Sequence, residues 1–136
     1  MANYYATARS SYFTVKDTMA FEAWCKAHNL HYWTNTDGCY TITPDDDPGH
    51  WPLYEPELDE NDDEVEFDLE TELSKHLATN QVAILIEVGS EKLRYLTGHT
   101  VAIHADGRTC HISLQDIYAQ AQSTFGDDVT ITRAEY

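Results

Sequence analysis

Carboxylates are the side chains of this chain with the clearest capacity for chemistry, and they crowd into residues 45–72. Fourteen of the twenty-four Asp and Glu residues lie there, and none of the eight Lys and Arg residues does. The rest of the chain holds ten acids against eight bases, so this segment carries almost all of the net charge of −16. Such a density of carboxylates can bind divalent cations, transfer protons in catalysis, or present a negative surface to a basic partner.

Calcium binding would need a particular spacing of these acids. The residues at positions 1, 3, 5 and 12 of an EF-hand register would be Asp59, Asn61, Asp63 and Glu70. Position 6 of such a loop is Gly, because the chain turns sharply there, but this chain has Glu64. Pro-rich sequence also takes the place of the incoming helix. We therefore expect no specific calcium site and no cofactor.

Nucleophilic or hydrolytic catalysis has little support in the sequence. Cys25 falls on the apolar face of an expected helix, where a thiol is inert, and neighbouring carboxylates would raise its pKa. Neither Cys-x-x-Cys nor His-Glu-x-x-His occurs to anchor a zinc ion. We expect a protein that is not an enzyme. A small metal-dependent or hydrolytic enzyme stays as the alternative, because any two of the fourteen acids could stand at a catalytic separation.

The elements before the acidic segment are expected to be a strand, a helix and a hairpin. Residues 3–15 are rich in Tyr, Thr, Phe and Val, which favours a strand. Phe21, Trp24, Cys25 and His28 recur at helical spacing within 18–28, after the potential cap Asp17. Strands near 30–36 and 39–43 are joined by Asp37-Gly38, which predicts a two-residue type I′ turn.

The elements after the acidic segment begin with a helix that starts at Asp68. Its leucines repeat every four residues. The apolar run 81–88 predicts a central strand. A hairpin turning at Asp106-Gly107 follows, with Gly98 as a bulge or bend. Ser113 and Asp116 form a capping box for a last helix that stops at Gly126, and the remaining residues suggest a short edge strand.

This order predicts an α+β fold in which helices pack on one face of an antiparallel sheet. The first six elements match a ferredoxin-like βαββαβ core, to which the C-terminal hairpin and helix are added. We expect a single domain over 1–136, with an acidic Pro-rich loop at 44–67. Trp51 and Tyr54 lie inside that loop, so we expect them either to anchor it to the domain or to contact a partner.

Composition narrows the function further. A hydrophobic content of 42% is typical of a globular chain. No apolar run is long enough to span a membrane, no signal peptide is recognisable, and three unpaired Cys indicate reduced thiols, so we expect a cytoplasmic protein. The strong negative charge disfavours nucleic acid and anionic membranes as direct partners and favours a basic protein.

Small size, strong acidity and concentration of the charge in one segment are similar to the phage- and plasmid-encoded acidic inhibitors of host defence, the anti-CRISPR and antirestriction DNA mimics. The resemblance implies an inhibitor that occupies a positively charged, nucleic-acid-binding surface of a partner protein. The same features fit immunity proteins against basic nuclease toxins. A second copy of the chain, which would form a homodimer, is a further candidate partner. The expected partner-binding residues are Asp59, Glu60, Asp62, Asp63, Glu64, Glu66, Asp68, Glu70 and Glu72, with Trp51 and Tyr54 at the edge.

Overall fold

The computed structural model of the protein describes residues 4–44, 49–92 and 95–134. The first part of the acidic segment, residues 45–48, therefore lies outside the described residues. Three helices and six strands follow one another in the order β1 (Tyr5–Ser10), α1 (Thr18–Ala27), β2 (Leu30–Thr34), β3 (Tyr40–Pro44), α2 (Leu69–His76), β4 (Val82–Glu91), β5 (Tyr95–His104), β6 (Thr109–Ser113) and α3 (Asp116–Phe125). No helix in these ranges is long and apolar enough to cross a membrane.

The strands form two sheets, one with the order β1-β4-β5-β6 and one made of the β2–β3 hairpin, and all neighbouring strands are antiparallel. The predicted α+β class is confirmed, but the ferredoxin-like arrangement in a single sheet is not. β3 meets the chain just after β1 through one isolated bridge, between Phe13 and Tyr40, and does not pair with β1 along its length. Beside that bridge, the hydroxyl of Ser10 accepts a hydrogen bond from the backbone N–H of Ile42 at 2.9 Å. This donor of β3 is thus satisfied by a side chain rather than by a backbone carbonyl of β1.

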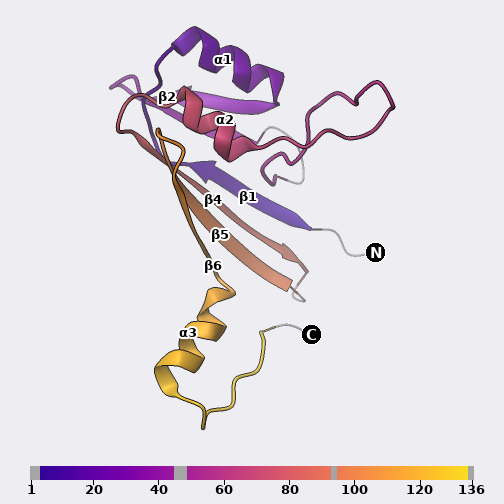
Figure 1. Cartoon of the computed structure of the whole chain (residues 1–136), viewed down its shortest axis with the longest axis vertical. Helices are drawn as coiled ribbons and strands as arrows, with labels where there is room; N and C mark the ends of the chain where they lie inside the picture. The colour runs from indigo at the N-terminus through magenta and orange to yellow at the C-terminus, as the bar shows by residue number, and fades with distance from the viewer. Residues whose placement is uncertain (1–3, 45–48, 93–94, 135–136) are drawn as a thin grey trace.

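Helices α1 and α2 and the β2–β3 hairpin cover one face of the four-stranded sheet, which we call the inner face (Figure 1). The Asp17 side chain caps α1 as predicted, and Phe21, Trp24 and Cys25 are buried. From α2, Leu69 and Leu73 join them in the core. The alternating inner residues of β4 and β5 complete the core: Ala83, Leu85, Val101 and Ile103.

Both predicted hairpin turns exist, but their geometry differs from a two-residue turn. The N–H of Gly38 bonds the carbonyl of Asn35 at 3.1 Å, and the N–H of Gly107 bonds that of His104 at 2.9 Å. Of the residues at each turn, only the glycine has a positive φ, 80° and 96°. A type I′ turn needs positive φ at both central residues. These are therefore three-residue loops in which a glycine follows a type I turn.

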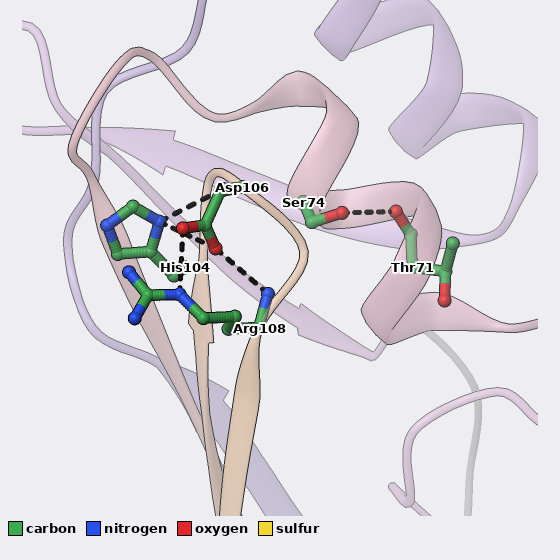
Figure 2. Close-up of polar contacts among 5 residues, drawn as sticks. All are labelled: Thr71, Ser74, His104, Asp106 and Arg108. Carbon is green, nitrogen blue, oxygen red and sulfur yellow. Dashed lines mark hydrogen bonds and ion pairs between the residues drawn. The ribbon is translucent and has the colours of Figure 1, made fainter.

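Figure 2 shows the second of these turns beside α2. The Asp106 carboxylate accepts hydrogen bonds from the backbone N–H of Arg108 at 3.0 Å and from its guanidinium at 2.8 Å. These bonds lower the pKa of Asp106, and the backbone bond is the main cause. In α2, the Ser74 hydroxyl donates to the carbonyl of Thr71 at 2.6 Å. Both contacts are local, one within the turn and the other within the helix.

The C-terminal part departs most from the expectation. Gly98 is neither a bulge nor a bend, because it pairs regularly with Val88. A Cβ there would lie 2.8 Å from the Leu114 side chain, so a larger residue at this position would force Leu114 to shift. Helix α3 ends at Gly126 as predicted, but no residue of α3 is buried. The described part of the tail, residues 127–134, forms no strand, so the edge-strand prediction is wrong there.

Candidate partner-binding surface

The acidic loop is an ordered arm rather than a coil. Its two sides run antiparallel, with the N–H of Glu55 bonded to the carbonyl of Val65 at 2.7 Å and that of Phe67 bonded to Leu53 at 2.9 Å. Tyr54 and Glu66 form a β-bridge between these bonds. Figure 1 shows this segment projecting from the body of the molecule next to α2. We call residues 53–67 the acidic arm.

The tip of the arm is held by Asp59. Its carboxylate accepts hydrogen bonds from the N–H groups of Asn61 at 2.8 Å and Asp63 at 3.0 Å. Its backbone N–H bonds the carbonyl of Asp63 at 2.9 Å, and Asp62 adopts a left-handed φ of 62° between them. An Asp side chain that bonds its own following backbone builds a turn. Asp59 therefore shapes the tip, whereas the sequence predicted only a partner contact for it.

Apart from Glu55 at its base, the remaining acids of the arm face solvent. The exposed set predicted from the sequence comprises Glu60, Asp62, Asp63, Glu64 and Glu66. Glu57 is also exposed on the arm, although it was not among the predicted binding residues. The sequence did contain a signal for Glu57, because Glu57 is one of the fourteen clustered carboxylates. Tyr54 remains 48% exposed and lies beside these acids, as expected for an apolar contact at the edge of the surface.

Trp51 does not belong to this surface. Its side chain is only 8% exposed and is part of the core. Its backbone N–H donates to the carboxylate of Glu87 at 2.8 Å. Of the two roles expected for Trp51, the role as an anchor is confirmed, whereas an exposed contact on the arm does not fit its burial. A large aromatic side chain in a polar loop is more stable in a nearby core than in water.

The base of the arm is fixed to α1 through His28, which the sequence analysis assigned only to the apolar face of that helix. The His28 ring stacks on Phe67 with ring centres 4.3 Å apart. Its Nε2 lies 2.8 Å from the carboxylate of Glu55. Because Phe67 is itself buried, the two sides of the arm leave the domain from a packed platform. The acids at the tip are thereby held at a defined distance from the core.

The three predicted acids in and next to α2 are partly engaged within the protein. Asp68 caps the helix, and a hydrogen bond from the Thr71 hydroxyl is the main cause that lowers the pKa of Asp68. Glu70 lies 2.9 Å from His111 of β6. Glu72 accepts from the indole N–H of Trp24 at 2.9 Å. These carboxylates add to the negative field but also hold α2 in place.

A cavity of about 480 Å³ opens at the base of the arm, between the start of α2 and the inner face of β4 and β5. Its walls are mainly apolar, and they include Trp51, Leu53 and Phe67. Asp68 and Glu70 also line it. A cavity of this size and composition can receive a large side chain or a small ligand.

Two of the other arrangements considered from the sequence were a reactive cysteine and a metal site. Burial raises the pKa of the Cys25 thiol to about 12, so Cys25 is a packing residue. Within residues 4–44, 49–92 and 95–134, no three His, Cys, Asp or Glu side chains are grouped so that they could hold a metal ion. No family model matches the chain, and neither a curated protein nor a solved structure is similar to it.

Proposed function

We propose that this protein binds a basic surface of a partner protein through the acidic arm, and that it thereby blocks a nucleic-acid-binding site. The observation that supports the proposal most is the order of the arm. Exposed carboxylates stand on a hydrogen-bonded hairpin anchored by Phe67 and Glu55. A charged segment that is already ordered loses less conformational entropy on binding than a disordered tail would.

Electrostatics favours this use of the arm. Clustered like charges repel one another, so they lower the stability of the free protein. A basic partner relieves that repulsion and is steered toward the arm, which raises the association rate by about 10-fold to 1000-fold at low salt. A surface that binds the phosphates of nucleic acid is rich in Lys and Arg. It therefore offers the complementary charge, as would the surface of a nuclease.

The cavity beside the arm adds a site for an anchoring contact. Most binding energy at protein interfaces comes from a few large side chains, such as Arg or Tyr, that enter pockets. We place such a side chain of the partner in the cavity lined by Phe67 and Leu53, where Asp68 and Glu70 provide negative charge for an arginine. Tyr54 stands on the arm as a further contact.

Two variants with the same net charge test the proposal. The arm variant E60Q/D62N/D63N/E64Q keeps Asp59, because Asp59 holds the tip turn. The remote variant D37N/E91Q/D127N/D128N changes four acids outside the arm. Each raises the formal charge of −16 by four, to −12. Immobilised wild type and variants are compared for the proteins that they retain from a lysate of the source cells. Each retained protein is then released with duplex DNA.

We expect one protein of the lysate to be retained both by wild type and by the remote variant. The arm variant should fail to retain this protein, and duplex DNA should displace it from wild type. Equal retention by the arm and remote variants would overturn the assignment to the arm. A DNA–partner complex that still binds the wild-type protein would overturn the block of a nucleic-acid site. Because both variants have the same total charge, a difference between them cannot come from net charge alone.

A further inference from the structure

The face of the four-stranded sheet opposite the core is apolar and uncovered. Residues of β4 alternate between the two faces, and those that point away from the core are 37–50% exposed: Val82, Ile84, Ile86 and Val88. In register, Ile86 lies opposite Thr100, which lies opposite Ile112 of β6. Ile112 is 66% exposed. We call this side of the sheet the outer face. The apolar run of β4 is therefore buried on one side only.

Charge is nearly absent from the outer face, although the chain is strongly acidic. Among the described strand residues whose side chains point to this side, Arg9 is the only one of the formally charged types Lys, Arg, Asp and Glu. The whole chain has twenty-four acids, and the described strands place none of theirs on this side. A face meant for solvent on an antiparallel sheet is normally polar. The pattern indicates a surface that is covered by another apolar surface.

The same chain carries a second apolar surface without a covering, on α3. This helix has no buried residue, and Ile117 and Phe125 are 56% and 68% exposed. Leu114, just before it, packs over Gly98 on the outer face. The apolar surface thus continues from the sheet into α3. Figure 1 shows α3 beyond the end of the sheet, away from α1 and α2.

We propose that a second copy of this chain covers the outer face, in a two-fold symmetric dimer to which α3 of each copy contributes. A standard interface buries about 800 Å² per partner. The eight exposed apolar side chains named above and Leu96 of β5 are 37–68% exposed, and together they present an area on the order of 800 Å², as a stable dimer needs. A two-fold axis brings the same surface of both copies together, so each sheet and each α3 gains a partner.

Electrostatics selects a second copy over an unrelated acidic or basic protein. A surface with a single formal charge offers no complement to a highly charged partner. Two copies can meet there without placing carboxylates against each other, because the acidic arm leaves the molecule from the layer that covers the inner face. A shallow groove of about 370 Å³ between Tyr5, Val88 and Leu114 leaves room for a large side chain of the partner copy.

Sedimentation equilibrium across a concentration series tests the dimer. The wild type should sediment at twice the mass of the 15.5 kDa chain. The double variant I86K/I112K should weaken dimerisation by about 100-fold or more, because it places two buried charges in the centre of the interface. The matched control M19K changes an 81% exposed residue of α1 and should remain dimeric. Because α3 contributes nothing to the core, I117A/F125A provides a second test that does not endanger folding.

Three outcomes would overturn the dimer through this face. These are a wild-type monomer at every concentration, a dimer that survives in both I86K/I112K and I117A/F125A, or a dimer that M19K disrupts equally. A circular dichroism spectrum matching the wild type confirms that each variant is folded. An apolar interface should not weaken as salt rises, whereas binding through the acidic arm should. Salt dependence therefore separates a failure of the dimer from a failure of the proposed function.

Discussion

Substitution of Glu87 by Ala should destabilise the protein by about 1.5–4.5 kcal/mol, because this buried carboxylate joins three parts of the chain. Glu87 is 7% exposed on the inner face of β4. One oxygen accepts from the backbone N–H of Trp51 at 2.8 Å, and the other accepts from the Tyr4 hydroxyl at 2.9 Å. It therefore fixes the start of the acidic segment to the sheet.

The magnitude follows from the two donors left behind. The Trp51 N–H is buried, so losing its acceptor costs about 1–3 kcal/mol. The Tyr4 hydroxyl lies 3.2 Å from the hydroxyl of Thr97 and can turn to it, so its loss costs about 0.5–1.5 kcal/mol. Glu87→Gln keeps an acceptor for the backbone donor and should cost about 1 kcal/mol or less. Tyr4→Phe removes only the second bond.

Urea unfolding followed by tryptophan fluorescence measures each free energy of unfolding. We expect Glu87→Ala to be the least stable protein, followed by Tyr4→Phe and then by wild type. A Glu87→Ala protein within about 0.5 kcal/mol of wild type would show that the carboxylate does not hold the segment. A double variant in which the two effects simply add would show that Tyr4 and Glu87 are not coupled.

Three further predictions concern the turns, the arm and pH. Gly38→Val and Gly107→Val should each lower the free energy of unfolding by about 1 kcal/mol or more, since both glycines have positive φ. Melting temperatures equal to wild type in both would refute the turn geometry. Replacement of residues 56–64 by Asn-Gly should leave a cooperatively melting protein, because the paired Glu55 and Val65 already close the loop. Loss of the circular dichroism signal would show that the tip supports the core. Burial lowers the pKa of His76 in the folded state, so the unfolded state binds this proton first as pH falls. Stability should therefore drop below pH about 6.5, and His76→Phe should remove part of that drop, which urea unfolding at pH 7 and pH 5 measures.

Local structure was largely predictable from the sequence, because its signals are short-range. The cap at Asp17, the leucines of α2 and the stop at Gly126 each involve residues within one or two helical turns. The turn glycines were found for the same reason. Their exact turn type was not, because Asn35 and His104 close the loops with backbone bonds that no dipeptide pattern encodes.

Long-range pairing was not predictable. The hydroxyl of Ser10 bonds the backbone of β3 across about thirty residues of sequence, a contact that no local pattern indicates. The sequence left both roles open for the two aromatics of the loop, and no local pattern decides that Trp51 enters the core while Tyr54, three residues later, stays exposed. The apolar run of β4 predicted a central strand correctly, but periodicity cannot tell whether one face or both are covered within the chain.

The most direct test of the account is the salt dependence of binding between this protein and the partner retained from lysate. Association rates are measured by surface plasmon resonance at 50 and 300 mM salt for wild type, the arm variant E60Q/D62N/D63N/E64Q and the remote variant D37N/E91Q/D127N/D128N. We expect wild type and the remote variant to associate at least about tenfold more slowly at the higher salt. The reason is that salt screens the attraction between the charges of the two proteins beyond about 10 Å or less. The arm variant should bind slowly at both. Equal rates for the arm and remote variants at low salt would contradict the claim that the acidic arm recognises the partner.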